Sequence, residues 1–271
     1  MNKPFEVTFL GTNGSCAHSN GNRQKYGSNT SCVAVAAGDE TLIFDTGSGI
    51  CGFAGLEKYQ RKHINIFYTH YHVDHIHGLL FSPFLFDTEI SVDIYGFKAE
   101  NMDVKSIVNN FLSSPFHPVG IMNFDAAVNF RDLTAGKSIA LSNIVVHTHL
   151  LEHSSCGAVG YRVEYDGKAF VHCPDIELSL HKNDNNLLEF ISNADLLVLD
   201  AFFDDSQVIE EWGHSSWKEC TEWATRANAK KLALFHHRFI NTDAEIDAME
   251  AKAKKEFSGA FAAADFMKVE L

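Results

Sequence analysis

THYHVDHIHG, residues 69–78, is the most informative segment of the chain, because it concentrates three histidines and an aspartate within six consecutive positions. A short apolar run with aromatic and β-branched residues precedes it and predicts a strand. On an extended backbone His70 and His72 point to the same face, since side chains alternate along a strand. A turn after His72 would bring Asp74 and His75 round to a second position. Imidazole and carboxylate are good donors for Zn, Mn or Fe, so the segment indicates a metal site rather than a histidine-rich surface loop.

On either side of this segment, short apolar or alternating runs bounded by Gly, Asn, Ser and Asp predict strands in both halves of the chain. We expect strands over residues 5–10, 31–36, 41–44, 64–68, 90–95, 127–130, 143–149, 159–165, 169–172, 196–199 and 231–235, and helices over residues 102–112, 216–227 and 242–255. Thr242 and Glu245 form the capping box of the last helix. Strands followed by helices in each half predict an α/β fold with two sheets packed face to face. No linker divides the chain, so we expect a single domain, residues 1–271.

The composition of the 271 residues, 45% hydrophobic and 21% charged, is that of an ordinary globular protein. No apolar run approaches the roughly 20 residues that span a bilayer. The amino-terminal segment lacks the features of a signal peptide, and a cytoplasmic location is therefore expected. The six cysteines form no CxxC pair and are interpreted as reduced thiols.

The formal net charge of −13 argues against binding to long nucleic acids, whose affinity for proteins comes largely from Lys and Arg. A small phosphate substrate is still compatible with an acidic surface, because a bound metal ion can dominate the local field.

The HxHxDH pattern resembles the signature of the metallo-β-lactamase superfamily, and four further segments match the motifs of that family in order. They are Asp45 in LIFDTG, His153 in LEHS, Asp175 in CPD and His236 in LFH. The resemblance implies a four-layer αββα sandwich with two mixed β-sheets and flanking helices. It also implies that Asp45 orients the metal loop and a ligand histidine.

By the same resemblance the chain binds two divalent metal ions, with zinc expected first and manganese or iron also compatible. His70, His72 and His153 would hold one ion, Asp74, His75 and His236 the other, and Asp175 would bridge them. His237 is an alternative to His236, although adjacent residues on a strand face apart. We interpret His77, His147, His149 and His172 as polar or structural residues.

Other segments resemble one branch of the superfamily, which contains ribonuclease Z and small phosphodiesterases that act on cyclic nucleotides or cyclic phosphates. They are FLGT (9–12), YGSNTSC (26–32), GYR (160–162), WGHSSW (212–217) and FHH (235–237). In this branch the histidine that matches His214 lies near the leaving group or a phosphate oxygen. The alternative is a structural residue at the start of a helix. Glu211 or Asp204 would orient it. Only a short acidic stretch, residues 176–194, stands where many ribonucleases Z carry a long arm that grips tRNA.

The resemblance therefore implies a dinuclear-metal hydrolase, a phosphodiesterase that cleaves a small cyclic nucleotide or cyclic phosphate by means of a metal-bridging hydroxide. Asp74 and His214 are the candidate catalytic residues. Phe81, Pro83 and Phe84 would form an apolar wall for a base or sugar, unless they belong to the core.

Three alternatives stay open, namely an RNA-processing endonuclease of the ribonuclease Z type, a lactone or thioester hydrolase, and a metal-binding module without turnover. The expected partner is a small phosphodiester, with no membrane and no long nucleic acid. The family often forms dimers, which leaves a homodimer open.

Overall fold

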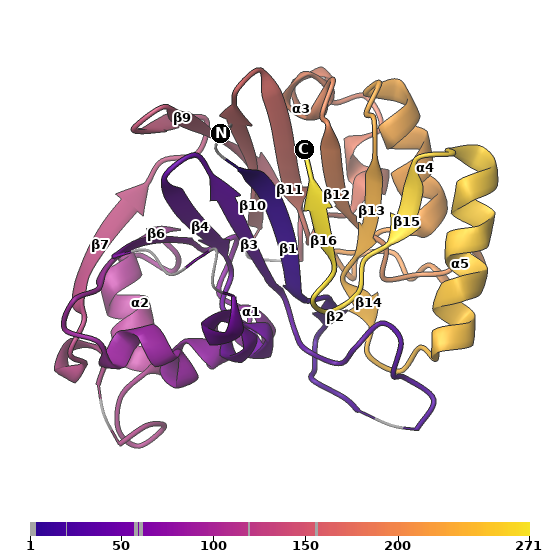
Figure 1. Cartoon of the computed structure of the whole chain (residues 1–271). Coiled ribbons are helices and arrows are strands. Elements are labelled where there is room, and N and C mark those ends of the chain that lie inside the picture. The colour runs from indigo at the N-terminus through magenta and orange to yellow at the C-terminus, as the bar shows by residue number, and fades with distance from the viewer. Residues whose placement is uncertain (1–3, 20, 57–58, 60–61, 119, 155–156) are drawn as a thin grey trace.

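A computed structural model describes residues 4–271, apart from residues 20, 57–58, 60–61, 119 and 155–156. Two seven-stranded sheets pack face to face, and helices cover the outer face of each (Figure 1). This arrangement confirms the predicted four-layer α/β sandwich. Among the described residues no helix combines the length and the apolar character that crossing a membrane requires.

The first sheet comes mainly from the amino-terminal half and has the strand order β16-β1-β3-β4-β5-β6-β7. Its strands are β1 (Phe5–Gly11), β3 (Cys32–Ala37), β4 (Glu40–Phe44), β5 (His63–Phe67), β6 (Ser91–Phe97), β7 (Ala127–Leu133) and β16 (Lys268–Glu270). The strands from β4 to β7 are parallel to one another. The outer face packs against η1 (Ser48–Gly55), η3 (His77–Phe81), η4 (Pro83–Phe86) and α2 (Val104–Phe111).

The second sheet has the order β15-β13-β12-β11-β10-β9-β8. Its strands are β8 (Ser138–Leu141), β9 (Ile144–Leu151), β10 (Ala158–Tyr165), β11 (Lys168–Cys173), β12 (Leu196–Asp200), β13 (Leu232–Phe235) and β15 (Ala260–Ala262). Three helices cover it, α3 (Asn185–Ile191), α4 (Trp217–Arg226) and α5 (Asp243–Glu256). Capping boxes start α4 at Ser216 and α5 at Thr242, the second as predicted.

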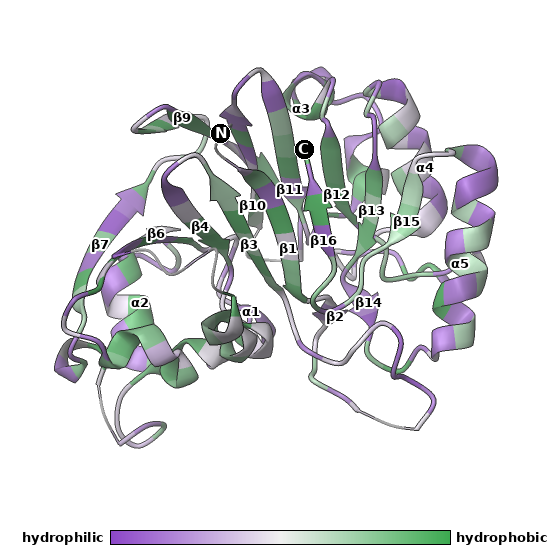
Figure 2. Ribbon diagram, in the orientation of Figure 1, coloured by the Kyte–Doolittle hydropathy of each residue, from purple (hydrophilic) through white to green (hydrophobic). Residues whose placement is uncertain are grey.

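The main core lies between the sheets, where aromatic side chains such as Phe44, Phe67, Tyr161 and Phe170 interlock. The central strands are buried on both faces and are accordingly rich in apolar residues, whereas α5 carries polar residues on its outer side (Figure 2). The five cysteines in the described part of the chain are free thiols; Cys156 lies outside it.

Most predicted elements are present within one or two residues of their expected bounds, but several short elements were not predicted. They are β2 (Asn13–Gly14), β8, α3, β14 (His237–Arg238), β15, β16 and the 3-10 helices, among them η5 (Ile121–Asn123), η6 (Leu178–His181) and η7 (Asp205–Gln207). Strands of two to four residues are too short for a hydrophobic period to show in the sequence. They form because the neighbouring chain supplies hydrogen-bond partners.

One edge of the sandwich collects the ends of several strands. Strands β11, β12 and β13 are parallel, and β9 runs in the same direction because both β9 and β11 are antiparallel to β10. The segments that follow these strands, and the loop after β5 of the first sheet, meet at this edge. In α/β proteins the carboxyl ends of strands are where ligand sites form.

Candidate metal centre

The histidine-rich segment leaves β5 as an extended loop and then forms a single helical turn, α1 (Val73–Ile76). His72 precedes this turn with an extended backbone, at φ −61° and ψ 150°. The ring centroids of His70 and His72 lie 4.4 Å apart, and those of His70 and His75 lie 4.2 Å apart. The extended half and the helical half of the segment therefore turn their side chains toward one cluster.

The other three predicted ligands follow strands of the second sheet. His153 comes after β9, Asp175 after β11 and His236 directly after β13. All three are buried. His236 adopts a left-handed backbone conformation, with φ +56°, a conformation that is costly for a side chain of this kind and that clusters at functional sites.

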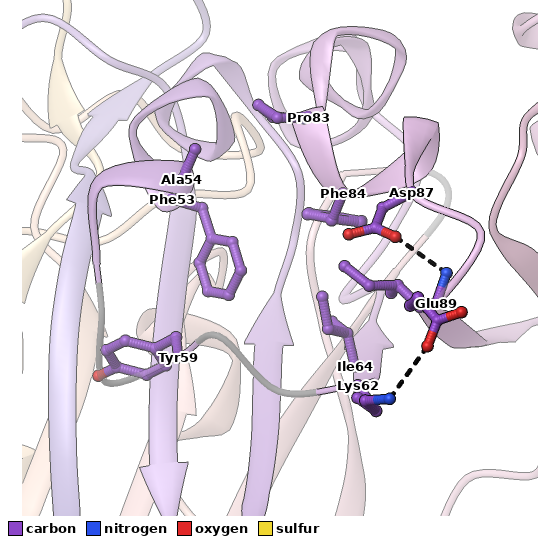
Figure 3. A pocket seen from close by; sticks show the side chains of 10 residues that line it. Phe53, Ala54, Tyr59, Lys62, Ile64, Pro83, Phe84, Asp87 and Glu89 are labelled. Carbon is purple, nitrogen blue, oxygen red and sulfur yellow. Dashed lines mark hydrogen bonds and ion pairs between the residues drawn. The ribbon is translucent and has the colours of Figure 1, made fainter.

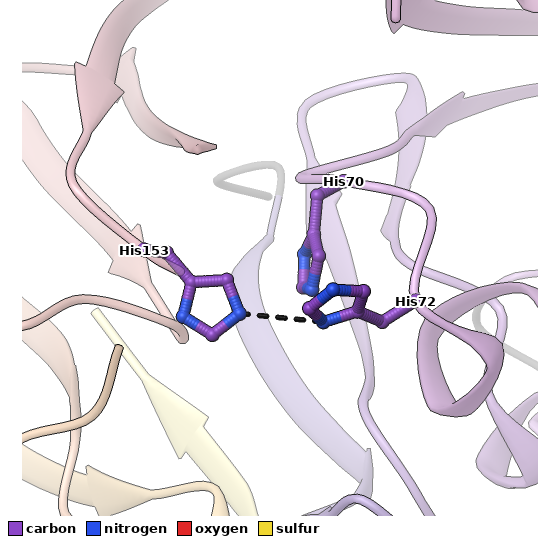
Figure 4. A group of neighbouring side chains, drawn as sticks. All are labelled: His70, His72 and His153. Atoms are coloured by element: carbon purple, nitrogen blue, oxygen red, sulfur yellow. Dashed lines mark hydrogen bonds between the residues drawn. The ribbon is translucent and has the colours of Figure 1, made fainter. Parts of the chain in front are cut away.

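The seven predicted ligands form one compact cluster of donor atoms. The ligand atoms of His70, His72 and His153 lie within 4.8 Å of one another, as do those of Asp74, His75 and His236. His153 Nε2 lies 3.3 Å from His72 Nδ1 across the seam between the two sheets (Figure 4).

Asp175 lies between the two groups of ligands. Its Oδ1 lies 3.2 Å from His236 Nε2 and 3.7 Å from His153 Nε2, and its Oδ2 lies 3.2 Å from His75 Nε2. One carboxylate thus reaches histidines of both groups, which is the arrangement expected of a bridging ligand.

Asp45, at the end of β4, holds the metal loop in place. Its carboxylate accepts hydrogen bonds from the backbone N–H of Thr69 (2.8 Å) and from Thr69 Oγ1 (2.9 Å to Oδ2). His75 Nδ1 lies 2.7 Å from Asp45 Oδ2 and donates to it. This contact leaves His75 Nε2 facing Asp74 and Asp175. Asp45 itself is buried and has φ +59°.

The buried polar atoms of the cluster are those that a cation would satisfy. His70 Nε2, His75 Nε2 and Asp175 Oδ2 are buried and make no hydrogen bond in the described structure, although buried polar atoms are nearly always hydrogen-bonded. Burial, together with neighbouring rings, lowers the pKa of His70 and His236 far below the usual range and that of His153 to about 3. A neutral imidazole is the form that binds a metal ion. Burial would lower the pKa of His75 as well, but the carboxylates of Asp175, Asp74 and Asp45 raise it. These carboxylates carry the negative charge that a cation would offset, so the residues together fit divalent cations.

His214 lies beside the cluster, in the segment between η7 and α4. Its ring is 5.1 Å from those of His153 and His236 and stacks on Phe202 at 4.3 Å. Burial by itself would lower the pKa of His214, but the carboxylate of Asp200, 2.7 Å from Nδ1, outweighs burial and raises this pKa to about 9. The ring of His214 is therefore held in one orientation, and the carboxylate of Asp200 stabilises its protonated form.

The expectation that Glu211 or Asp204 orients His214 is wrong, because Asp200 at the end of β12 does so. Asp204 instead caps η7 and pairs with Lys252 at 2.7 Å. Glu211 has an exposed side chain, and its backbone N–H donates to Glu177. The signal in the sequence was the position of Asp200 at the carboxyl end of a buried strand.

Glu177 and Gly213 also orient residues of the site, and the sequence analysis did not predict these roles. The buried carboxylate of Glu177 accepts hydrogen bonds from the backbone N–H of Glu211 (3.1 Å) and of Gly213 (2.9 Å). Gly213 O in turn accepts from His153 Nδ1 at 2.6 Å. The loop that contains Gly213 therefore orients His153 through the Gly213 carbonyl, and His214 is the next residue of the same loop.

The structure assigns other places to several residues that had been considered for the site. His237 is buried, with Nε2 2.9 Å from Ala263 O and its ring against Tyr26, so His236 is the residue in the cluster. The expected apolar wall is wrong for Phe84, which lies in the core beneath the first sheet. Phe84 and Pro83 line a cavity of about 440 Å³ on the outer face of that sheet (Figure 3), and none of its lining residues belongs to the cluster.

A second cavity, of about 340 Å³, opens directly beside the cluster. His70 and His72 form part of its wall. The remaining wall comes from the end of β6 and from the facing ends of β9 and β10, so this cavity lies at the seam between the two sheets.

Comparison with known proteins agrees with this geometry. Residues 40–237 match the beta-lactamase superfamily domain. Two similar sequences are proteins named Ribonuclease Z, from Archaeoglobus fulgidus, 26% identical over 98% of both chains, and from Prochlorococcus marinus, 25% identical over 98% of this chain and 100% of the relative.

The fold is also similar to solved structures. A metallo-beta-lactamase fold protein of Bacillus subtilis has a TM-score of 0.75 at 22% identity, with 99% of this chain and 100% of that chain covered. The short form of human tRNase Z gives 0.68 at 21%, with 97% and 98% covered. A diphosphatase from the PhnP family gives 0.69 at 18%, with 98% and 97% covered.

The loop that carries Gly213 and His214 provides a test of this geometry. A Cβ at Gly213 would lie 2.6 Å from Ser154 N and 2.7 Å from His153 Nδ1, at φ +79°. Gly136 has a similar φ of +75° but nothing within 4 Å of the added atom. We expect Gly136→Ala to lower the melting temperature by about 2–4 °C, the effect of about 1 kcal/mol of backbone strain. Gly213→Ala should lower it by at least about twice as much in thermal denaturation; equal losses would contradict the described packing.

Proposed function

The chain belongs to the beta-lactamase superfamily, and from the cluster described above we propose that it is a metal-dependent phosphodiesterase that acts on a small cyclic nucleotide or cyclic phosphate. The single observation that supports this function is the juxtaposition of seven imidazole and carboxylate ligands with an oriented proton donor, His214, on a metallo-beta-lactamase scaffold.

We assign two divalent cations to the cluster, zinc first, with manganese and iron compatible with the same donors. His70, His72 and His153 would hold one ion, Asp74, His75 and His236 would hold the other, and Asp175 would be shared between them. When bound, such ions supply an activated water and offset the negative charge of a phosphate. Asp74, whose Oδ2 accepts a hydrogen bond from Ser15 N–H at 2.8 Å, is held in a fixed orientation by the loop after β2.

His214 acts on the leaving group in this proposal. With Nδ1 held by Asp200, Nε2 is the nitrogen free to deliver a proton. A diester substituent departs as an alkoxide and needs that proton, and a positioned general acid contributes about 10²–10⁴ in rate. Asp200 fixes the ring and stabilises its charged form.

The relatives named Ribonuclease Z support a second candidate, an endonuclease that processes RNA. Two observations favour the small diester. The net charge of −13 opposes a long polyanion. The segment after Asp175 stands where many ribonucleases Z carry a long arm that grips tRNA. Here it folds into η6 and α3, with Leu178, Leu187 and Ile191 packed in the core of the second sheet.

A substrate panel separates these functions. Purified protein with its metal content determined by elemental analysis is assayed on cyclic nucleotides, cyclic sugar phosphates, bis(nitrophenyl) phosphate, lactones, thioesters and precursor tRNA. We expect hydrolysis of small phosphodiesters and intact precursor tRNA on gels. Cleavage of the precursor with no turnover of small diesters would support the ribonuclease Z function instead. Turnover of lactones or thioesters alone would support the lactone or thioester hydrolase.

The ligand assignment predicts that Asp175→Asn and His72→Ala lose both bound metal and activity. We expect less than one tightly bound ion per chain and a fall in kcat/KM of more than about 100-fold, because each change removes a donor from a closed set. His77→Ala is the matched control, since His77 lies on the same segment but its Nδ1 bonds to Val73 O. Full activity in a metal-depleted Asp175→Asn protein would rule out the assignment.

The role of His214 predicts a dependence on the leaving group. His214→Ala should keep its metal content and lose about 100-fold or more in kcat for alkyl diesters. The loss should be much smaller for nitrophenyl esters, whose leaving groups need no proton. Asp200→Asn should show the same pattern in weaker form. A uniform loss across all leaving groups would show that His214 has a structural role instead.

A further inference from the structure

The cavity beside the cluster has the composition of a site for a flat apolar group. Its walls include Phe97 at the end of β6 and Ala99 just after it, Leu150 near the end of β9, and the buried Ala158 and Val159 of β10. Its volume of about 340 Å³ lies within the range of ligand pockets, about 300–1,000 Å³. A small sugar phosphate would leave these apolar walls unfilled.

One aromatic wall of this cavity is held rigidly. Tyr71 Oη donates a hydrogen bond to Phe97 O at 2.7 Å, which joins the metal loop to the end of β6. The tyrosine passes so close to Gly96 that a Cβ there would lie 2.3 Å from its Oη. A lining residue fixed in this way adds no ordering cost when a ligand contacts it.

The single charged residue in the described lining is Lys98. Its side chain is 66% exposed and its nearest carboxylate, Asp132 Oδ2, lies 3.9 Å from Nζ. A contact of that length in solvent is weak, so the ammonium group is available to an anionic or carbonyl oxygen of a ligand. Apolar walls with one cation at the rim match a nucleobase and its attached sugar.

The position of the cavity relative to His214 decides which part of a diester it receives. His70 and His72 belong to the wall of the cavity, whereas the ring of His214 contacts those of His153 and His236 and lies outside the lining. In a diester with two separate substituents, the substituent in the cavity is therefore not the one that His214 protonates. It stays bonded to phosphorus after the other ester bond breaks.

We propose that the cavity bounded by Tyr71, Phe97 and Leu150 binds the nucleoside that remains on phosphorus, so that the enzyme prefers nucleoside diesters over sugar phosphates and releases a nucleoside monophosphate. This inference rests on the proposed phosphodiesterase function. The P–O bond on the His214 side breaks, water supplies the new oxygen on phosphorus, and the leaving oxygen takes up the proton.

Two diesters with the same leaving group test the preference. Thymidine 5′-(p-nitrophenyl phosphate) carries a nucleoside on the retained side, and methyl p-nitrophenyl phosphate carries only a methyl group. We expect kcat/KM to be at least about tenfold higher for the thymidine ester, the effect of stacking one base. Thymidine 5′-phosphate should be the product.

Leu150→Glu places a carboxylate in the wall and should reduce this ratio to about one. Leu150 is 57% exposed, so the substitution is compatible with folding. Leu180→Glu is the matched control, because Leu180 is 62% exposed and lies outside the lining; its ratio should equal that of the unmodified protein. A ratio near one in the unmodified protein, or a ratio that Leu150→Glu leaves unchanged, overturns the inference while the phosphodiesterase function stands.

Hydrolysis of neither ester would count against the proposed function, and a binding measurement then tests the cavity by itself. In calorimetric titrations of the metal-loaded protein, thymidine 5′-phosphate should bind at least about tenfold more tightly than 2-deoxyribose 5-phosphate. The difference should disappear in Leu150→Glu. Equal affinities in the unmodified protein would overturn the inference independently of turnover.

Discussion

One buried carboxylate, that of Asp45, is the constraint on which the centre depends. It stands at the end of β4 and binds Thr69 and His75, which follow the neighbouring parallel strand β5. The Nδ1–H of His75 is thereby committed to Asp45, and only Nε2 is left for the cluster. A carboxylate that fixes the tautomer and the direction of a histidine in this way is the usual partner of a metal-binding imidazole. Asp45 is buried, and its φ of +59° lies in the left-handed region. This conformation costs free energy for a residue other than glycine, so the surrounding structure must hold Asp45 in it.

Close backbone approach completes this constraint. The N–H of Thr46 donates to His75 O at 2.7 Å, and the N–H of Gly78 donates to Thr46 O at 2.8 Å. A Cβ on Gly47 would lie 2.3 Å from Asp74 O, and one on Gly78 would lie 2.1 Å from Gly47 O. The glycines at both ends of the contact let the loop after β4 and the helical turn α1 pack without side chains between them. The geometry of Asp74 and His75 is therefore set by backbone packing as well as by the carboxylate.

The gathering of the seven candidate ligand residues could be predicted from the sequence because each lies in a short motif that resembles one of the family. Each motif adjoins a strand, and strands that end at one edge bring such motifs together. Asp200 and Glu177 could not be assigned, since their roles depend on which backbone N–H or ring lies opposite them after folding. Glu211 and Asp204 were chosen for nearness in sequence to His214, whereas Asp200 reaches it across the segment that contains η7. Phe84 follows the metal loop in sequence but turns beneath the first sheet, because the chain passes to its outer face at η3 and η4.

Charge explains how an acidic protein can serve an anionic substrate. Five carboxylates are buried at this edge. Asp45 pairs with His75, Asp200 pairs with His214, and Glu177 accepts hydrogen bonds from backbone N–H groups, which leaves Asp74 and Asp175 to face the donor atoms of the cluster. Two proposed divalent ions would more than neutralise this remaining pair, so that the local field is positive although the net charge is −13. Exposed charges are screened beyond about 8 Å at physiological ionic strength. A small diester at the centre would therefore respond mainly to the local field, whereas a long nucleic acid would extend over the acidic surface as well. Under the proposed function, this difference in range would favour small substrates.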